Sequence, residues 1–200
     1  MSKISWKGST LLGPIPPALI TCGTLEQPNV LTVAWTGIVN TQPPMTYISV
    51  RPGRFSYPLI CQSGEFVINL TTKELARATD YCGVRSGRDV DKFKETGLTA
   101  VEATKVKAPL IAEAPVNIEC RITEKKELGS HHMFLAEVLA VHVDEKYLDE
   151  NGKFQLNKSG LIAYSHGEYL DLGKEIGTFG YSVKKKTKKP QKRKKKKVER

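Results

Sequence analysis

The chain has 200 residues, of which 40% are hydrophobic, enough for one domain with a hydrophobic core of its own. The whole chain carries +10, but residues 184–200 contain twelve Lys or Arg and one Glu, so they carry +11 and residues 1–183 carry −1. A nearly neutral body argues against a domain that binds nucleic acid over a broad basic surface. We therefore predict a folded domain over residues 1–183 and a disordered basic tail over residues 184–200.

Neither the N-terminus nor the cysteines indicate export or metal binding. The segment MSKISWKGST lacks the apolar stretch of a secretory signal peptide, and no apolar run reaches the roughly 18 residues that span a bilayer. No CxxC pair or Cys/His cluster occurs among the four scattered cysteines, which are Cys22, Cys61, Cys82 and Cys120. We expect a cytoplasmic protein with free thiols, no metal site and no membrane span.

Short strand-like segments fill most of residues 16–70. Gly, Pro or Asn separates one segment from the next, and the segments are PPALITCGT, NVLTVAWT, MTYISVR, PLICQ and EFVINL. This spacing favours an antiparallel sheet or barrel over β-α-β units. Two short helices are predicted next. TTKELARATDY would begin with Thr71 as N-cap and Glu74 completing a capping box. SGRDVDKFKETG would begin at Ser86 and end at Gly97.

Strands resume after the second helix. In PVNIECRIT the residues Val116, Ile118, Cys120 and Ile122 alternate with polar ones, which predicts a half-buried strand whose other face is wet. HMFLAEVLAVHVD is apolar on both faces, so we expect it at the centre of the sheet or at a subunit contact. Asn151-Gly152 is a strong hairpin signal. The predicted fold class is mainly β, a β-barrel with two short inserted helices.

The segment LTVAWTG, residues 31–37, is the first candidate site. Alternation puts Leu31, Val33 and Trp35 on a core-facing side and leaves Thr32, Ala34 and Thr36 as a flat, small, weakly polar surface. A planar aromatic ligand would fit against such a surface, with hydroxyls and backbone amides meeting its heteroatoms. An ordinary solvated strand face fits the same pattern equally well.

The segment SVRPGRFS, residues 49–56, is the second candidate. The strand before it ends at a Pro-Gly turn, and Arg51, Arg54 and Ser56 would converge there at the rim of the sheet. An arginine fork matches phosphate geometry. Two charged hydrogen bonds contribute roughly 3–6 kcal/mol, whereas micromolar binding needs about 8 kcal/mol. We therefore expect a phosphate that carries an apolar group, such as a flat ring system.

Several of these strings together resemble a known family. PALITCGT, N-x-LTVAWTGIVNTQPPMTYISVRPGRFSYPLI and SGEFVINL are similar to the flavin reductase-like family, and within it to the flavoredoxins. The likeness continues through CGVRSGRDVDKF, GSHHMFLAEV and HGEYLDLGKEIGTFGYS, so that it covers nearly all of residues 8–183. The resemblance implies an FMN-binding split β-barrel that usually forms a homodimer with its flavin sites near the subunit interface.

The resemblance also implies roles for particular residues. The isoalloxazine ring of FMN would lie beside Thr32, Ala34, Trp35, Thr36 and Gly37. The phosphate end would lie at Ser49, Val50, Arg51, Arg54 and Ser56, which agrees with the anion site inferred from the turn alone. Further cofactor-binding candidates are Asn69, Ser86, Gly87, Arg88 and Lys92. The predicted helix start at Ser86 would suit an anion, or would be only a capped helix.

The first functional interpretation is a flavoprotein that transfers electrons through non-covalently bound FMN, charged by a redox partner protein or by NAD(P)H. The alternative is an NAD(P)H:flavin oxidoreductase that releases reduced flavin. A third class, nucleic-acid binding through the basic tail, would give weak, non-specific contact with polyanions. A reactive Cys82 thiol or a proton-relaying histidine (His131, His132 or His166) near the flavin is weighed against a buried thiol and ordinary surface histidines.

Overall fold

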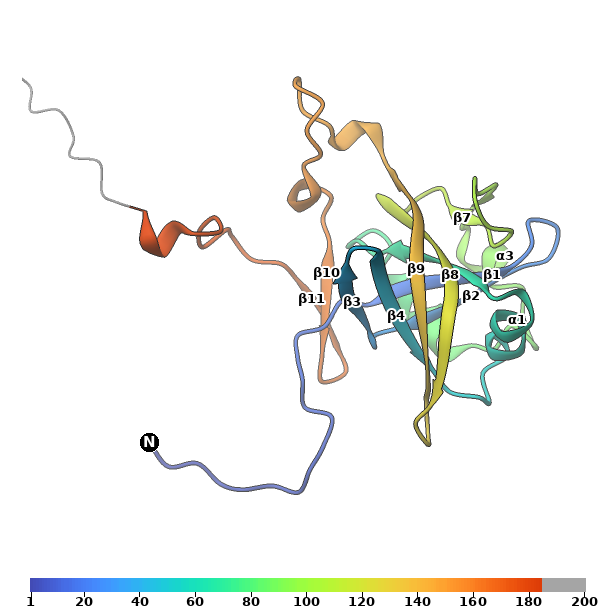
Figure 1. Cartoon of the computed structure of the whole chain (residues 1–200), viewed down its shortest axis with the longest axis horizontal. Helices are drawn as coiled ribbons and strands as arrows, with labels where there is room; N and C mark the ends of the chain where they lie inside the picture. Colours follow the sequence, from blue (N-terminus) through green and yellow to red (C-terminus); the bar gives the residue numbers. More distant parts are fainter. Residues whose placement is uncertain (185–200) are drawn as a thin grey trace, which may run out of the picture.

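The computed structural model describes residues 1–184, and the predicted basic tail, apart from Lys184, lies outside the described residues. Its main feature is a seven-stranded antiparallel sheet in the order β2-β1-β5-β8-β9-β4-β3 (Figure 1). These strands are β1 (Ala18–Gly23), β2 (Pro28–Val33), β3 (Thr36–Thr41), β4 (Pro44–Val50), β5 (Glu65–Leu70), β8 (Val116–Glu127) and β9 (His132–Val143).

Smaller elements surround this sheet. Two two-stranded sheets consist of β6 (Ala100–Val101) with β7 (Leu110–Ile111), and β10 (Ile162–Ser165) with β11 (Glu168–Asp171). The α-helices are α1 (Ser56–Ser63), α2 (Ala76–Val84) and α3 (Lys92–Thr96), and the 3₁₀ turns are Glu145–Tyr147, Leu156–Lys158 and Tyr181–Val183. The predicted mainly β architecture with short inserted helices is therefore confirmed.

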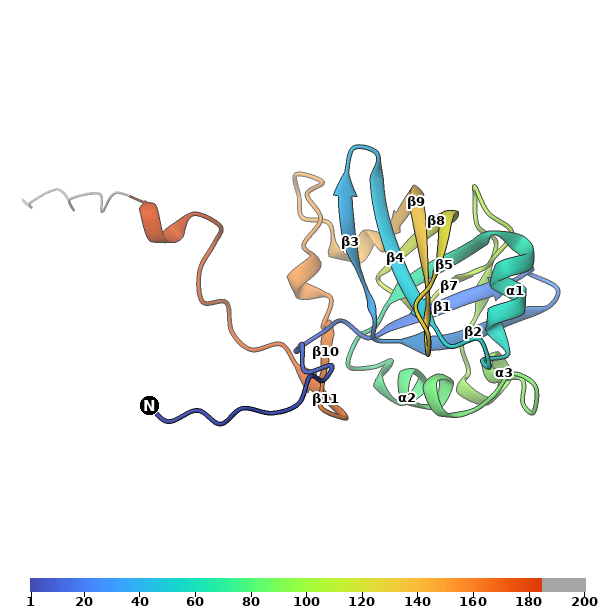
Figure 2. The same cartoon turned by 60° about the horizontal axis from the view of Figure 1, so that its bottom comes forward.

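The sheet curls until its two edges meet. Strands β2 and β3 are the outermost strands of the sheet, yet only Ala34 and Trp35 separate them in the chain. Because three extended residues span roughly 10 Å at most, the two edges must lie close together at this link. Figure 2 shows β3 rising from the end of β2. The apolar core fills the inside of the curled sheet, with Ile20, Phe66 and Phe134 fully or almost fully buried.

The helices cover outer parts of the sheet. A second apolar cluster joins Leu19 of β1 and Val30 of β2 to residues of α2 and α3, among them Cys82 and Phe93. Helix α1 packs against β1 and β5. The predicted strand PLICQ is wrong, because residues 58–62 lie in α1. Pro58 occupies the first turn and Gly64 ends the helix in the left-handed region, and a short apolar run does not by itself distinguish a strand from a helix.

The two predicted helices exist, but both begin later than predicted. Helix α2 begins at Ala76, and the Thr71 hydroxyl donates to the carbonyl of Pro17 instead of capping a helix. Residues 86–90 form turns, and Asp91 caps α3 by accepting from the Lys94 amide, so the prediction of a helix start at Ser86 is wrong. The predicted end at Gly97 is confirmed by its left-handed conformation.

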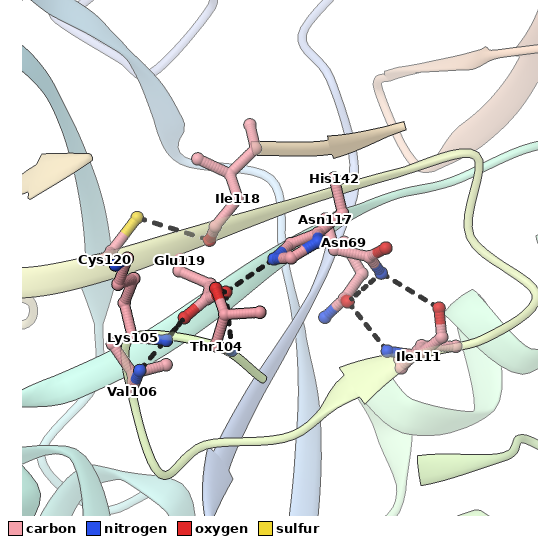
Figure 3. A network of polar contacts seen from close by, with 10 residues as sticks. All are labelled: Asn69, Thr104, Lys105, Val106, Ile111, Asn117, Ile118, Glu119, Cys120 and His142. Atoms are coloured by element: carbon pink, nitrogen blue, oxygen red, sulfur yellow. Dashed lines mark hydrogen bonds and ion pairs between the residues drawn. The ribbon is translucent and has the colours of Figure 1, made fainter. Parts of the chain in front are cut away.

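One face of β8 is buried where the alternation predicted a wet face. Asn117 and Glu119 are 8% and 0% exposed, because residues 102–111 fold over them (Figure 3). The Glu119 carboxylate accepts hydrogen bonds from the Thr104 amide and hydroxyl, the Lys105 and Val106 amides, and Nε2 of His142 on β9. The loop of residues 102–111 and His142 of β9 thus supply the partners that water would otherwise supply.

Candidate functional site

A cavity of about 570 Å³ lies where the two edges of the sheet meet. Its walls come from the end of β2, the Ala34–Trp35 link, the end of β4 with the following turn, α2, the β8–β9 turn and the β10–β11 hairpin. Its lining residues include Ala34, Trp35, Arg51, Arg54, Asp80 and His131. We call this space the main cavity.

The Ala34–Trp35 link forms one wall of the main cavity. Alternation predicted that Trp35 would face the core with Leu31 and Val33, and this is wrong: its exposed fraction is 39%, and its ring packs on His131 with the centroids 4.2 Å apart. The reason is that β2 ends at Val33, so the alternation stops there. The backbone stays tied to β4, since the Ser49 amide donates to the Trp35 carbonyl over 2.9 Å.

Two arginines form the positively charged end of the main cavity. The amide of Arg54 donates to the carbonyl of Arg51 over 3.0 Å, which closes the predicted Pro-Gly turn and places both side chains at the cavity. Nη1 of Arg54 donates to the carbonyl of Gly83 in α2 over 3.0 Å. Neither arginine forms an ion pair with any carboxylate of residues 1–184. Their charge therefore remains available to an anionic ligand.

A second, smaller cavity of about 100 Å³ shares Leu31, Thr32, Arg54 and Gly83 with the main cavity. Of the eight predicted residues that do not line the main cavity, it collects four, which are Ser56, Ser86, Gly87 and Lys92. It also includes Arg85, which the sequence patterns did not single out. Its remaining lining residues are Gly53 and Phe55. The two cavities are therefore adjacent, and Arg54 lines both.

Three predicted residues line a cavity but use their polar groups within the protein. The Ser56 hydroxyl, 2% exposed, accepts from Nδ2 of Asn29 over 2.6 Å. The Lys92 amino group donates to the carbonyls of Val30 and Cys82 over 2.8 Å each, and burial lowers its pKa. The Thr32 hydroxyl donates to the carbonyl of Thr79 and so ties β2 to α2. These groups position the walls.

Four predicted residues line neither cavity. Asn69 is fully buried, and its amide oxygen accepts from the Ile111 amide and from Nδ2 of Asn117, as Figure 3 shows. Its amide nitrogen donates to the carbonyl of Leu19. In β3, the Thr36 hydroxyl donates to the Tyr47 carbonyl, and Gly37 pairs with the same residue of β4. Arg88 lies in the turn after Ser86. The structure gives these four residues no place at the cavity walls.

The sequence patterns did not indicate the part of the cavity wall that comes from α2 and the β10–β11 hairpin. Asp80 and Val84 come from α2, and Tyr164, Gly167 and Tyr169 come from the β10–β11 hairpin. Burial and the nearby Asp80 raise the pKa of Tyr169 to about 12, so its hydroxyl stays protonated at neutral pH. The string HGEY was part of the family likeness, but no local pattern indicated that this hairpin would reach the cavity.

The thiols play no visible part in this site. Cys82 is 1% exposed, and burial raises its pKa to about 11, so the interpretation as a buried structural cysteine holds over the reactive one. Among residues 1–184 no group of three or more metal-ligating side chains comes together. No helix in this part of the chain is long and apolar enough to cross a membrane.

The fold and the cavity define the class of protein. The architecture is that of a split barrel: it matches a putative flavin reductase with a split barrel domain from Shewanella frigidimarina at a TM-score of 0.75 and 22% identity, over 84% of this chain and 87% of that one. Flavoredoxin of Desulfovibrio vulgaris matches more closely, at a TM-score of 0.84 and 32% identity, over 92% of this chain and 100% of that one. A flavoredoxin from Methanosarcina acetivorans matches at a TM-score of 0.82 and 28% identity, over 92% and 100% of the two chains.

The family follows from the sequence as well. The family described as "Flavin reductase like domain" matches residues 13–173, which is most of the chain. The protein therefore belongs to the flavin reductase-like family, and the resemblance to flavoredoxins is confirmed. Membership supports a flavin cofactor and a flavin-related oxidoreductase role.

Proposed function

We propose that the protein is an electron carrier of the flavoredoxin type, which holds FMN non-covalently in the main cavity. The observation that carries this proposal is that Arg51 and Arg54, which form no ion pair with any carboxylate of residues 1–184, both line a cavity of about 570 Å³. A volume of this size suits a ligand of a few hundred daltons. Flavin would supply the redox chemistry, and the protein would bind and orient it.

The residues at the cavity fit the two ends of FMN. Arg51 and Arg54 would hold the phosphate, with Arg85 and Ser86 of the smaller cavity beside them. Charged hydrogen bonds from a guanidinium to a phosphate are stronger than neutral ones. The ring would lie along the Ala34–Trp35 link, where strand β2 has ended and its backbone groups are not all used in the sheet.

A second function remains in view, an NAD(P)H:flavin oxidoreductase that releases reduced flavin. The observation in its favour is that Asp80 and Tyr169, from two further elements, offer polar groups at the wall of the main cavity. A second substrate would need such groups. In the carrier, by contrast, FMN stays bound between reactions.

Purified full-length protein distinguishes the two functions. The carrier is expected to elute from gel filtration with a flavin absorbance spectrum in about a 1:1 ratio to protein. The reductase is expected to elute colourless and to oxidise NADH or NADPH only when FMN is added. A protein that does neither, with FMN in excess, would contradict both functions.

We also propose a homodimer, as the family resemblance implies. Exposed apolar side chains support it: Ile38 in β3 is 86% exposed, and Val141 and Val143 at the end of β9 are 54% and 38% exposed. Light scattering on the wild type and on Ile38→Asp tests this, with a dimer expected only in the former. The cytoplasmic location and the weak polyanion contact of residues 184–200 stay predictions, the latter because it concerns residues outside those described.

A further inference from the structure

Of the four histidines in the chain, His131 alone lines the main cavity. It lies in the turn between β8 and β9, directly before the first residue of β9. His132 instead meets the hydroxyl of Tyr57 over 2.6 Å, and His142 meets Glu119. The third, His166, is exposed at the tip of the β10–β11 hairpin. Only His131 can therefore touch a ligand from the cavity wall and change its charge near neutral pH.

The surroundings of His131 disfavour its charged form. Burial, and then the charges of Arg51 and Arg54, lower its pKa below the ordinary value of 6.5. Without a ligand, the imidazole is therefore neutral at pH 7. The same two arginines would bind the phosphate in the proposed function, so a bound phosphate would offset the positive charges that act together with burial to disfavour protonation of His131.

The nearby groups accept either protonation state of His131. The Ser130 hydroxyl lies 3.0 Å from Nδ1, and a hydroxyl can donate to a neutral ring nitrogen or accept from a protonated one. The Trp35 ring packs against the imidazole at a centroid distance of 4.2 Å, and an indole face attracts a cation. Protonation therefore breaks no contact of the side chain.

The carboxylates around the cavity do not supply the missing negative charge. Glu127, on the same hairpin, forms an ion pair with Lys125 at 2.9 Å and lies 3.9 Å from Nδ1 of His132. Asp80 lies on α2 and acts on the Tyr169 hydroxyl. No carboxylate of residues 1–184 forms an ion pair with His131 itself. The anion that would complete this cluster of two arginines and one histidine must come with a ligand.

We propose that His131 takes up a proton when a phosphate-bearing flavin enters the main cavity, so that flavin binding is coupled to proton uptake. This inference rests on the proposed function. A phosphate monoester carries about −1.5 to −2 charges at pH 7 and offsets the two guanidinium charges that face the ring. By linkage, any ligand that raises the pKa of His131 binds more tightly at the lower pH. Riboflavin, which has the ring but no phosphate, should not raise it.

Isothermal titration calorimetry tests the coupling between pH 6 and pH 8. Full-length wild type and His131→Gln are titrated with FMN and with riboflavin, in buffers of different ionisation enthalpy, and the protons exchanged are obtained from the difference. Wild type is expected to take up as much as one more proton per FMN than His131→Gln. As the pH rises, the FMN affinity of wild type is therefore expected to fall, by up to tenfold per pH unit relative to that variant. Titration of the ligand's own phosphate, with a pKa near 6, is common to both proteins and cancels.

The control variant is His166→Asn, which removes a histidine that does not line the cavity and should behave as wild type. Asparagine tolerates the left-handed backbone that His166 adopts at φ 50°. In parallel, NMR titration of the His131 ring in wild type gives its pKa with and without FMN, so the test does not depend on a variant that might misfold.

The outcomes separate the two proposals. Equal proton uptake by wild type and His131→Gln, the same uptake with riboflavin, or an unchanged pKa of His131 in the NMR titration would each overturn the coupling while FMN binding itself stands. Absence of any heat and any spectral change with FMN would instead overturn the proposed function, and the coupling with it.

Discussion

Glu119 and the pair Arg51 and Arg54 are charged side chains of one small domain, and the protein treats them in opposite ways. Glu119 is fully buried and accepts five hydrogen bonds from Thr104, Lys105, Val106 and His142. The two arginines line a cavity, and the guanidinium of Arg54 makes one hydrogen bond, to the backbone carbonyl of Gly83. The Glu119 carboxylate therefore has its hydrogen-bond partners within the described part of the chain, whereas most N–H groups of the two guanidinium groups do not.

This difference separates structural polar groups from binding groups. A buried charge with every lone pair used holds chain segments together and has nothing left for a ligand. Asn69 and Lys92, both predicted as cofactor contacts, belong with Glu119 in this respect, because their polar atoms bond within the protein. A charged side chain that lines a cavity and forms no ion pair within the protein can instead bind a ligand of opposite charge.

The largest expected effect comes from removing the two arginines that line the main cavity. Arg51→Ala combined with Arg54→Ala should weaken FMN binding on the order of 100-fold, since two charged hydrogen bonds contribute about 3 kcal/mol at the lower end of their range. Riboflavin binding should change by no more than about threefold, since riboflavin lacks the phosphate. Fluorescence titration with both ligands measures this. Arg77→Ala with Lys94→Ala, which removes the same charge from helix surfaces outside both cavities, should leave both affinities unchanged; equal losses for both flavins would contradict the assignment.

The next largest effect is expected from changing the buried carboxylate of Glu119. Glu119→Gln should lower the free energy of unfolding by about 2 kcal/mol at pH 7, because an NH₂ group would face the amides that now donate to the carboxylate. Urea denaturation measures it, with Glu124→Gln on the exposed part of β8 as the control. A loss of flavin affinity without a loss of stability would contradict the assignment of Glu119 to a purely structural role.

The same carboxylate predicts an acid dependence of stability. Burial opposes ionisation of Glu119, but hydrogen bonds from His142 and Thr104 outweigh it and lower the pKa from 4.5 to about 2. The unfolded chain therefore binds the proton more readily than the folded one, so this contribution is present above pH 4.5 and is lost as the pH falls toward 2. Between pH 4.5 and pH 2 the stability of wild type should fall more steeply than that of Glu119→Gln.

A smaller effect is expected in the wall of the smaller cavity. A Cβ at Gly87 would collide with Oδ1 of Asn29 and lie 2.8 Å from Cδ1 of Phe55, whereas a Cβ at Gly53 would meet nothing within 4 Å. Gly87→Ala should cost about 1 kcal/mol of stability and weaken FMN binding, since the turn that carries Ser86 must shift. Thermal unfolding with and without FMN measures both effects, and Gly53→Ala is the matched control. Indistinguishable variants would show that this turn adapts freely.

The smallest expected effect comes from the tail. Deleting residues 184–200 should leave the flavin spectrum and the affinity for FMN unchanged, while removing a charge of +11. Retention on a heparin column at low salt should fall sharply. Loss of flavin from the shortened protein would place the domain boundary after residue 183.

Much of the fold could be predicted because it depends on local patterns. Short apolar segments separated by Gly, Pro or Asn located β1, β2, β4 and β5, and the alternation in PVNIECRIT located β8. The apolar run HMFLAEVLAVHVD located β9, and Gly97 marked the end of α3. The order of strands could not be predicted, since β5 pairs with β1 and β8 through contacts between distant parts of the chain. The buried face of β8 was missed for the same reason: the loop that covers Glu119 is a tertiary feature.

The site divides in the same way. Arg51 and Arg54 could be placed together from sequence because a single turn connects them. Asp80, His131 and Tyr169 come from three separate elements, and only the folded sheet brings them to one cavity. Trp35 was assigned to the wrong side because one break in a strand shifts every later residue out of the alternation.

Because a covalent link joins the two edge strands, one rim of the cavity resists widening more strongly than the other. Ala34 and Trp35 fasten one rim to the main sheet on both sides, whereas the β10–β11 hairpin is held by non-covalent contacts alone. These are backbone hydrogen bonds with Ile15 and Thr71, the ion pair between Lys73 and Asp171 over 2.7 Å, and the burial of Ile162 and Ala163. Widening the first rim would require the barrel to uncurl, whereas widening the second would require only these contacts to break. A flavin that leaves the cavity would therefore be expected to pass the hairpin, and the strength of these contacts would set its residence time.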